Sequence, residues 1–433
     1  MSKVKQLSFR GLMQQLDEVV SSWPDGRRGK NCQYRIRDAG LGAFAVFFMQ
    51  CASFLNFQQL MRDSLRKSNA QTLFGIEAIP CDNQIRSLLD PIEPSSLFAV
   101  FDQVLRQLNR CGQIKARRVL NGQLLVALDG VEYFHSDTIH CQHCSTRTDR
   151  HGQISYSHQA LTPVIVSPGE KTVLALAPEF ICPQDGATKQ DCETTAAKRW
   201  LQQHGAECKR LRVTILGDDL YCHQPICEAI LAQGLHFILV CKPSSHRALY
   251  EWLEGLEPKT LEVRRWTGRA HQFDHYRYLN ALPLRDGDDA LSVNGCELVT
   301  TNEQGRVLYR NSFATDHRID EHNVKALVKA GRTRWKIENE NNNTLKTQGY
   351  HFEHNYGHGQ QYLSALLATL ILLAFLFHTV LSLRDRQYQQ LRDYLGARKV
   401  FFNDLRALTR YICFPHWEAM LQFMRRQLEL EPP

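Results

Sequence analysis

The first 120 residues show the hydrophobic periodicity of helices and none of the alternation typical of strands. Leu41 to Leu60 is almost continuously apolar and aromatic. Arg86 to Leu89 precedes Asp90-Pro91, and a proline disfavours helical backbone in the residue before it. An amphipathic run follows Pro94, with apolar residues at helical spacing: Leu97, Val100, Phe101, Val104, Leu105 and Leu108. We therefore predict a helical N-terminal domain over residues 1–120.

From Gln123 onward, short apolar runs alternate with helical patterns, which predicts a mixed α/β core over residues 121–242. Turn residues close two of the runs, Asp129-Gly130 the first and Gly217-Asp218-Asp219 a later one. The predicted strands are Leu124 to Leu128, Tyr156 to Val166, Thr172 to Ala177, Leu211 to Leu216 and His236 to Cys241. The predicted helices are Ala187 to His204 and Gln224 to Gln233.

Residues 243–318 break this rhythm with alternating, aromatic and turn-rich segments. Asp286-Gly287-Asp288 and Asn294-Gly295 are typical of hairpin turns. We predict a β subdomain inserted into the core. A helical pattern resumes at Asp320 and runs to about Thr347, so the core is expected to continue over residues 319–383.

Leu363 to Leu383 is a run of 21 residues without Asp, Glu, Lys or Arg. That length could span a bilayer, but a helix apolar all round can also lie at the centre of a large soluble domain. The run contains Ser364, Thr369, His378, Thr379 and Ser382 and has no second hydrophobic partner segment. We therefore expect a buried core helix, no membrane, and a basic helical tail over residues 384–433.

The N-terminal segment MSKVKQLSFRGLMQQ is polar and amphipathic, which is not the pattern of a secretory signal. The 14 cysteines are spread along 433 residues, unlike a small disulfide-rich scaffold. Together these features predict a cytoplasmic protein with reduced thiols.

The net charge of +7 is too small to identify a partner, but its distribution is uneven. Residues 1–122 contain 17 Lys or Arg and 10 Asp or Glu, so they carry the entire excess. A basic helical module suits DNA binding. The alternative is a helical cap on the following domain.

Three acidic residues stand in positions suited to metal binding. Asp129 and Asp218 each follow a predicted buried strand, and Glu338 lies in the predicted helix GRTRWKIENENNNTLK. Ligand sites gather at the carboxyl ends of strands in α/β sheets, and carboxylates can hold two divalent ions that act on a phosphodiester. Each acid alone is more often a turn, cap or surface residue. Asp219 is the alternative to Asp218, which we favour because it comes first after the strand and Gly217 lets the backbone turn.

The order Asp, Asp, β insertion, Glu resembles the DDE transposases of bacterial insertion sequences. LLVALDG resembles the first catalytic strand of that family. VTILGDDLYCHQPICEAI with HFILVCKP resembles the second Asp segment, and RTRWKIENENNNTLKTQGYHFEHNYGHG resembles the Glu helix. The resemblance covers about residues 123–383. It implies an RNase H-like core with a β insertion, in which Asp129, Asp218 and Glu338 coordinate two Mg²⁺ ions, with Mn²⁺ as a substitute.

By the same resemblance, the protein is expected to bind terminal inverted repeats through its N-terminal module. It would hydrolyse a phosphodiester at the element end, and the freed 3′-hydroxyl would attack target DNA. The expected partners are double-stranded DNA and a second copy of the chain, and the expected location is the bacterial cytoplasm, at the nucleoid. The alternatives are another RNase H-like nuclease, such as a resolvase or a defence nuclease, and a non-catalytic DNA-binding protein whose acids are structural.

The chain departs from the related pattern of Tyr, two residues, Arg, three residues, Glu, six residues, Lys. Arg334 and Glu338 fit it, whereas Gly331 replaces the Tyr and Leu345 the Lys, with Lys346 one residue later. Helical geometry places Arg334, Glu338 and Asn341 on one face. Arg334 could pair with Glu338 or, as we favour, contact a phosphate while Glu338 holds metal.

Further DNA-binding candidates are Lys242, Arg332 and Lys346, for which ordinary surface charge is the alternative. Trp266 could stack on a displaced base, although packing in the core is the favoured interpretation. Glu193, at the start of a predicted helix, could support the metal site or simply favour the helix N-terminus.

Cys141 and Cys144 form a C-x₂-C pair preceded by His140. His151, His158, Cys182 and Cys192 follow within about 50 residues, but that stretch contains no second C-x₂-C or H-x₃-H pair. A structural zinc site needs four ligands. The favoured interpretation is a pair of free thiols in a loop beside Asp129, and a zinc site that includes Cys141 and Cys144 is the alternative.

Overall fold

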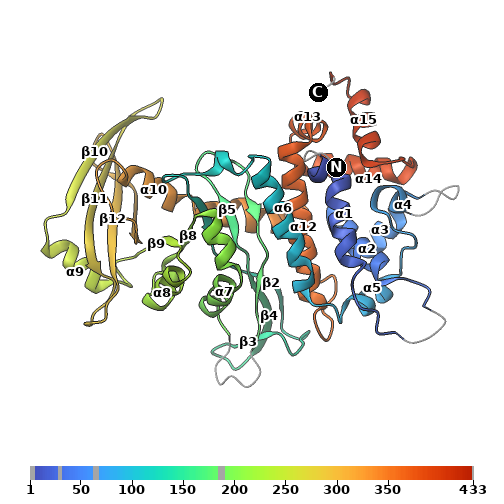
Figure 1. The fold of residues 1–433 in the computed structure, drawn as a ribbon, viewed down its shortest axis with the longest axis horizontal. Helices are drawn as coiled ribbons and strands as arrows, with labels where there is room; N and C mark the ends of the chain where they lie inside the picture. Colours follow the sequence, from blue (N-terminus) through green and yellow to red (C-terminus); the bar gives the residue numbers. More distant parts are fainter. Residues whose placement is uncertain (1–4, 28–31, 62–67, 184–190, 432–433) are drawn as a thin grey trace.

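The computed structural model describes residues 5–27, 32–61, 68–183 and 191–431. Helices gather at one end of an elongated molecule and long strands at the other, with a mixed sheet between them (Figure 1). The protein therefore has a mixed α/β fold with an open sheet and helical terminal segments, as the sequence predicts.

The middle of the sheet has the order β6-β5-β1-β8-β9. Its strands are β1 (Leu124–Ala127), β5 (Val164–Val166), β6 (Leu174–Ala175), β8 (Val213–Gly217) and β9 (His236–Val240). β1, β8 and β9 are parallel, whereas β5 is antiparallel to β1 and β6 is antiparallel to β5. The helices α7 (Glu193–Leu211) and α8 (Gln224–Ala232) precede β8 and β9. Short, buried strands of this kind read as continuous apolar runs, which is why the sequence pattern located them. Ala187, the predicted start of α7, lies outside the described residues.

The predicted β insertion extends this sheet instead of forming a sheet of its own. It consists of β10 (Lys259–Trp266), β11 (His271–Pro283), β12 (Ser292–Asn302) and β13 (Val307–Thr315). β13 pairs with β9, which gives one sheet of nine strands. A helix, α9 (Arg247–Gly255), precedes these strands and was not predicted.

The predicted turn at Asn294-Gly295 is wrong, because both residues lie inside β12. The Asn294 side chain accepts a hydrogen bond from the Ala281 amide at 3.1 Å and donates to the carbonyl of His317 at 2.9 Å. A Cβ on Gly295 would lie 3.0 Å from the Leu282 side chain. Tertiary contacts therefore explain this Asn-Gly pair. Asp286-Gly287-Asp288 does lie in the connection between β11 and β12, as predicted.

A second sheet of four strands stands beside the first. It consists of β2 (Gly130–Ser136), β3 (Ser145–Thr148), β4 (Ile154–Leu161) and β7 (Glu179–Ile181), with β4 pairing with the other three. The single strand predicted from Tyr156 to Val166 is wrong, since it divides at Thr162-Pro163 into β4 and β5, one in each sheet. Proline cannot donate to a sheet ladder, which favours such a break.

The N-terminal and C-terminal helices pack together as one body. The N-terminal helices are α1 (Phe9–Val20), α2 (Ile36–Phe48), α3 (Phe54–Met61), α4 (Asn69–Phe74), α5 (Asp82–Leu89) and α6 (Phe98–Arg110), and the C-terminal ones are α13 (Arg386–Leu395), α14 (Arg398–Tyr411) and α15 (Trp417–Gln427). Phe9 stacks on Trp417 with ring centroids 4.5 Å apart. The Asn69 amide donates to the carbonyls of Thr409 and Ile412 at 2.8 Å. The helical prediction for both segments is confirmed.

The apolar run forms α12 (Leu363–Arg384), the central helix of this body (Figure 1). It is long and apolar enough to cross a membrane, but 89% of its most apolar window is buried inside the protein. Phe377 packs edge-on against Phe44 of α2 with centroids 5.1 Å apart. The prediction of a buried core helix is confirmed, and this burial is consistent with a soluble protein.

The helix predicted from Asp320 to Thr347 is not continuous. It is divided into α10 (Val324–Arg332), a π-helical segment over Ile337–Asn342 and α11 (Asn343–Thr347). π-Helical turns are rare and are frequent at functional sites. This one contains Glu338, and it changes which side chains share a face.

Candidate functional site

Asp129 and Asp218 follow two neighbouring parallel strands in the same register. β1 pairs with β8 so that Ala127 lies opposite Leu216, and the Leu128 amide donates to the Leu216 carbonyl at 2.9 Å. The aspartates each lie two residues beyond this pair. Because neighbouring strands are about 4.8 Å apart, this register brings the two carboxylates together at the carboxyl end of the sheet.

The π-helical segment meets Asp129 through Asn342. The Asn342 side-chain amide donates to Asp129 Oδ2 at 2.8 Å. Thr162, in the link between β4 and β5, donates to Asn342 Oδ1 at 3.1 Å and through its amide to the Asp129 carbonyl at 3.1 Å. These bonds fasten the segment that contains Glu338 to the end of β1.

The predicted shared face of Arg334, Glu338 and Asn341 holds only in part. Arg334 and Glu338 do meet, but Asn341 is fully buried and donates to Thr162 Oγ1 at 3.3 Å and to Asn342 Oδ1 at 2.9 Å. The wider π-helical turn moves the inward-facing positions by about one residue relative to an α-helix. Asn342 therefore occupies the position at Asp129, and α-helical spacing could not have identified it.

Glu193, at the start of α7, is a fourth carboxylate at this site. Its Oε1 accepts hydrogen bonds from the Gly130 amide at 2.9 Å and from the Tyr221 hydroxyl at 2.5 Å. A Cβ on Gly130 would lie only 2.3 Å from Glu193 Oε2, so this approach requires glycine. The Gly130 amide and the Tyr221 hydroxyl thus hold the Glu193 carboxylate beside Asp129.

The four carboxylates act on one another electrostatically. The pKa of Asp129 is raised to about 7, with burial as the largest cause; the charges of Glu193, Glu338 and Asp218 also raise it, and Arg334 lowers it. Such a concentration of negative charge is unfavourable for the fold by itself and favours a divalent cation. The donor set consists of carboxylate oxygens, which are the ligands that Mg²⁺ and Mn²⁺ prefer.

The raised pKa of Asp129 predicts a pH-dependent stability in buffer without added divalent ions. Between pH 3.8, its ordinary value, and about 7, the folded protein holds a proton that the unfolded chain releases. The contribution of this group to the free energy of unfolding therefore falls as pH rises through that window. We expect the melting temperature of Asp129→Asn, relative to wild type, to be higher at pH 8 than at pH 5. Equal differences at both pH values would show that Asp129 does not titrate in this range.

Asp219 is occupied by structural hydrogen bonds. Its Oδ1 accepts from the Lys242 amide at 2.7 Å, and its Oδ2 accepts from the Ser245 hydroxyl at 2.6 Å. Asp218 Oδ1 accepts from the Leu220 amide at 2.9 Å, and no hydrogen bond occupies Oδ2 among the described residues. The structure thus favours Asp218 over Asp219 as the metal ligand. The expectation that Gly217 lets the backbone turn is wrong, since Gly217 ends β8 in ordinary strand backbone. The structure needs glycine there for space, because a Cβ would lie 2.8 Å from the Tyr221 side chain.

A pair of substitutions separates these two aspartates. We expect Asp218→Asn to weaken Mn²⁺ binding, measured by isothermal titration calorimetry, at least tenfold with little change in melting temperature. Asp219→Asn should keep the Mn²⁺ affinity and lower stability by about 1–3 kcal/mol, because asparagine keeps only one acceptor oxygen for the Lys242 amide and the Ser245 hydroxyl and loses the charge that strengthens both hydrogen bonds. The reverse pattern would make Asp219 the ligand.

Arg334 donates to Glu338 Oε1 at 2.7 Å. Glu338 is about half exposed, so this ion pair contributes little to stability. Of the two interpretations of Arg334, the structure shows the ion pair with Glu338. This pair holds Glu338 in one orientation. Arg334 Nη1 is buried and lacks a hydrogen-bond partner within the described ranges.

The other predicted DNA-binding residues lie at the surface. Arg332 stacks over the Tyr309 ring at 4.2 Å, and Lys346 pairs with Glu353 at 2.7 Å. The Lys242 side chain is exposed at the end of β9. Trp266 is 58% exposed at the end of β10, where its ring lies beside that of His271. The favoured interpretation that Trp266 packs in the core is therefore wrong.

The departures from the Tyr, Arg, Glu, Lys pattern have structural reasons. A Cβ on Gly331 would lie 2.7 Å from the Phe313 ring, so a tyrosine does not fit there. Leu345, at the Lys position, is fully buried. Tyr350 is buried too, and its hydroxyl bonds His378 at 2.7 Å and accepts from Arg398 at 2.8 Å. Tyr350 is therefore engaged inside the protein.

No protein-family model matches the chain, and no curated protein sequence matches it.

Proposed function

We propose that the protein is a DDE-type DNA transposase with an RNase H-like core. The sheet order β6-β5-β1-β8-β9 supports this proposal. Its first strand, β1, lies in the middle. The antiparallel strand β5 and then β6 lie on one side, and the parallel strands β8 and β9 lie on the other, as expected of an RNase H-like core. The long β segment enters after β9 and before the helix of Glu338, where the family has its insertion.

The observation that carries the proposal is the register of Asp129 and Asp218 together with the attachment of the Glu338 segment to Asp129. Elements separated by about 90 and 120 residues of sequence bring these carboxylates to one end of the sheet. The charges of Asp218 and Glu338 act on Asp129, which places them within electrostatic range. The order and spacing of these acids match the family resemblance.

The residues of the site have separate roles in the proposed reaction. Asp129, Asp218 and Glu338 would hold two divalent ions, which activate a water or a 3′-hydroxyl and stabilise the leaving oxygen of a phosphodiester. Asn342 and Glu193 position Asp129 and its backbone, and Arg334 orients Glu338. Arg334 is also close enough to the carboxylates to contact a phosphate oxygen once Glu338 turns toward metal.

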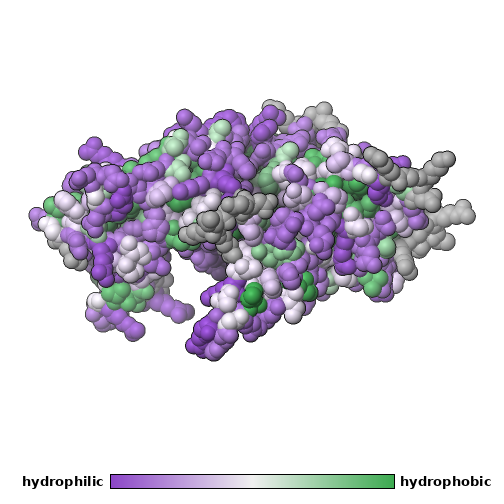
Figure 2. All heavy atoms as spheres, turned by 90° about the horizontal axis from the view of Figure 1, so that it is seen from below, coloured by the Kyte–Doolittle hydropathy of each residue, from purple (hydrophilic) through white to green (hydrophobic). Residues whose placement is uncertain are grey.

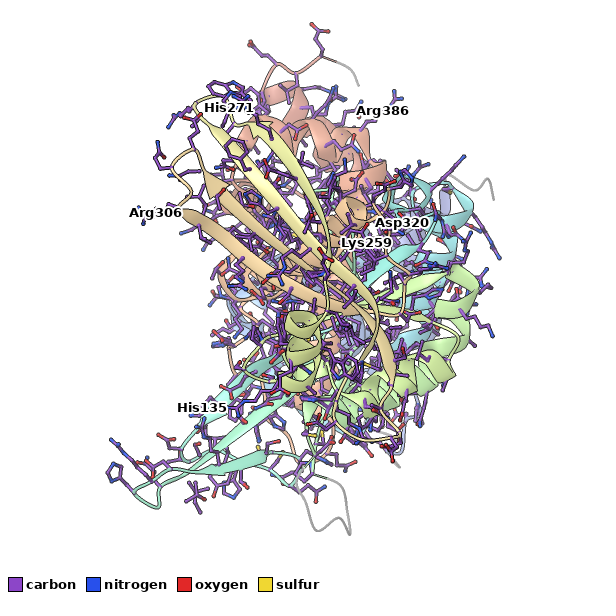
Figure 3. The ribbon with its side chains drawn as sticks, turned by 90° about the vertical axis from the view of Figure 1, so that its left-hand side faces the viewer. His135, Lys259, His271, Arg306, Asp320 and Arg386 are labelled. Carbon is purple, nitrogen blue, oxygen red and sulfur yellow. The ribbon has the colours of Figure 1, made fainter. Side chains whose placement is uncertain are left out.

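Two projecting parts of the surface suit DNA. The hairpins of the small sheet project near His135, on the same side as the strand ends marked by His271 and Arg306 (Figure 3). Seen from below, the surface is mostly hydrophilic, and the outline of the molecule is hollowed between two projecting parts (Figure 2). Exposed arginines lie on both projecting parts. Arg147 and Arg150 lie on the β3–β4 hairpin of the small sheet, and Arg264, Arg269 and Arg306 lie at the ends of the strands of the β insertion. Cations placed in this way would contact phosphates without regard to sequence.

The remaining parts of the proposal follow from the family resemblance and the charge distribution. The basic helices at the N-terminus would bind the terminal inverted repeats, and a homodimer would hold two ends in the bacterial cytoplasm. The expectation of a separate DNA-binding domain is modified by the packing of α1 on α15 and of α2 on α12, since these helices form one body.

A cleavage assay tests the proposal. The purified protein is incubated with Mg²⁺ and a DNA duplex that contains the sequences flanking its gene, and a duplex with scrambled flanks serves as the control. We expect a nick with a 3′-hydroxyl at the element end and joining of that end to a target plasmid. Cleavage of both duplexes alike would indicate another RNase H-like nuclease, such as a resolvase or a defence enzyme. DNA binding without cleavage would contradict the enzymatic proposal.

A further inference from the structure

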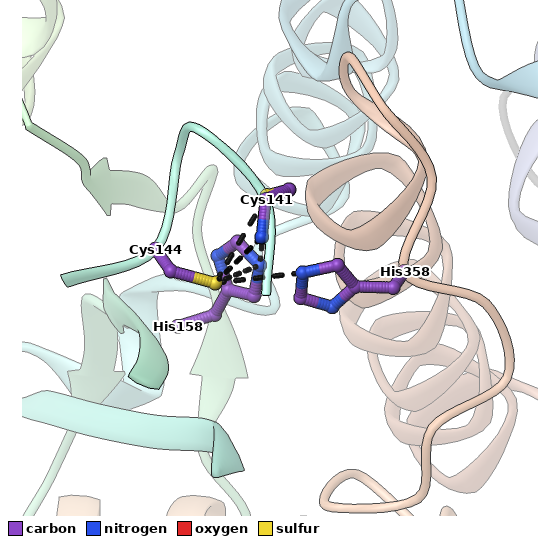
Figure 4. A group of neighbouring side chains, drawn as sticks. All are labelled: Cys141, Cys144, His158 and His358. Carbon is purple, nitrogen blue, oxygen red and sulfur yellow. Dashed lines mark hydrogen bonds between the residues drawn. The ribbon is translucent and has the colours of Figure 1, made fainter. Parts of the chain in front are cut away.

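Two cysteines and two histidines meet at a site separate from the carboxylates (Figure 4). Cys141 and Cys144 lie in the connection between β2 and β3, and His158 lies in β4. His358 comes from the segment before α12, more than 200 residues away from Cys144 in sequence. The four ligand atoms all lie within 4.8 Å of one another.

Four of the six distances between these atoms are close to those of a tetrahedral zinc site. With bonds of about 2.3 Å to sulfur and about 2.05 Å to nitrogen, a tetrahedron predicts about 3.8 Å between two sulfurs and about 3.6 Å between sulfur and nitrogen. Cys141 Sγ lies 4.0 Å from Cys144 Sγ and 3.6 Å from His158 Nε2. Cys144 Sγ lies 3.5 Å from His158 Nε2 and 3.4 Å from His358 Nε2.

The backbone around the cysteines is arranged to support thiolates. The Cys141 amide donates to Cys144 Sγ at 3.4 Å, and the His143 amide donates to Cys141 Sγ at 3.4 Å. A disulfide is excluded in this arrangement, because its sulfurs would be about 2.05 Å apart. Cys144 and His158 are both only 4% exposed. Neighbouring rings hold the imidazoles: Tyr133 stacks against His158 and Phe134 packs on His358.

We propose that Cys141, Cys144, His158 and His358 bind one Zn²⁺ ion in a closed structural site. Two thiolates and two imidazoles in a tetrahedron favour zinc among the common biological metals. All four coordination positions are filled by the protein, which leaves no position for a substrate. The site is therefore structural and independent of the carboxylates proposed for catalysis.

The position of the site indicates what the ion stabilises. The segment that contains His358 connects α11, which follows the Glu338 segment, with the central helix α12. The other three ligands belong to the small sheet, whose first strand β2 begins directly after Asp129. Zinc would thus fasten the segment after Glu338 to the strand after Asp129 and hold the two sides of the carboxylate site together.

Other clusters of potential ligands in the described part of the chain are less complete. Cys222, Cys241 and His246 form one group, and His236, Asp316 and His317 form another. Each offers only three ligand atoms, and neither contains a C-x₂-C pair. Only the first cluster combines four ligands with tetrahedral spacing.

A measurement of bound metal tests the proposal. Untagged protein is purified under reducing conditions, and its zinc content is measured by plasma mass spectrometry. We expect one zinc ion per chain in wild type and in Cys81→Ser, a control that removes an exposed thiol outside the cluster. Cys144→Ser and His358→Ala should each contain much less. If the variant that combines Cys144→Ser and His358→Ala retained one zinc ion per chain, the assignment would be overturned.

Cobalt provides a readout that does not depend on the folding of a variant. Wild-type protein titrated with Co²⁺ should develop the intense visible bands of tetrahedral thiolate coordination at one equivalent, and added Zn²⁺ should remove them. Chelator-treated wild type and His358→Ala should share one lowered melting temperature, which the chelator should not lower further in the variant. A wild-type protein that takes up neither ion would contradict the proposal, whatever the outcome of the DNA cleavage assay.

Discussion

Asp129→Asn and Glu338→Gln are each expected to reduce Mg²⁺-dependent DNA cleavage roughly a thousand-fold while leaving DNA binding unchanged. Bound metal ions contribute several kcal/mol of transition-state stabilisation, and about 4 kcal/mol corresponds to a thousand-fold change in rate. An amide retains the size of the side chain but removes its charge and one ligand oxygen. The rate of strand cleavage and the affinity for end DNA would be measured separately, by single-turnover kinetics and by fluorescence anisotropy.

Neither substitution should unfold the protein, so a loss of activity can be assigned to the site. Glu338 is half exposed, and Arg334 is its one side-chain partner within the described residues. Asp129 is unfavourable as a buried anion, and an amide there would not incur that electrostatic penalty. Glu340→Gln is the matched control, because Glu340 lies two residues further in the same π-helical segment. Equal losses in Glu340→Gln and Glu338→Gln would point to a disturbed helix, and full activity in Asp129→Asn would refute the site.

Phe377→Ala is expected to lower the stability of the protein by about 3–5 kcal/mol, the range for a large aromatic residue removed from a packed core. Phe377 is completely buried at the centre of α12 and packs edge-on against Phe44. The cavity would lie where α12 meets α2, so both helices lose contacts. Guanidinium chloride denaturation followed by circular dichroism measures the change.

Leu55→Ala provides the comparison for this core substitution. Leu55 is 52% exposed on α3, so its truncation removes little buried surface. We expect a change within about 0.5 kcal/mol for such a surface position. If the two variants were equally stable, α12 could not be the centre of the helical body, and its burial in a soluble fold would be in question.

The buried strands and the central helix were predictable because their signals are local. β1, β8 and β9 are short apolar runs, the first two of them closed by turn residues, and α12 is an apolar run too long for anything but a helix. Local chemistry also misled at Asn294-Gly295, where the side chain of Asn294 satisfies carbonyl groups after β13. No local signal distinguishes that arrangement from a hairpin turn.

The acidic residues of the candidate site were predictable from the sequence, but the residues that position them were not. Asp129, Asp218 and Glu338 follow from position and family resemblance, and the hydrogen bonds of Asp219 explain why it is the poorer ligand. Asn342 depends on a π-helical turn, which the sequence pattern of residues 320–347 does not reveal. Glu193 was a weak candidate, since its contact with Gly130 becomes visible only in three dimensions.

The zinc cluster shows a different limit of sequence analysis. Within about 50 residues of Cys141 and Cys144 the sequence offers His158, whereas the proposed fourth ligand, His358, lies more than 200 residues away. The sequence did contain a signal, because His354 and His358 have H-x₃-H spacing. The structure uses only His358 of that pair, while His354 packs against Tyr356.

The most direct test of the account is the location of manganese in crystals of the protein bound to DNA from its element end. We predict anomalous difference peaks between the carboxylates of Asp129, Asp218 and Glu338, next to a phosphate of the DNA. These peaks should disappear in crystals of Asp129→Asn. Manganese bound to the DNA complex elsewhere, with these three carboxylates unliganded, would contradict the central claim that they form the catalytic metal site.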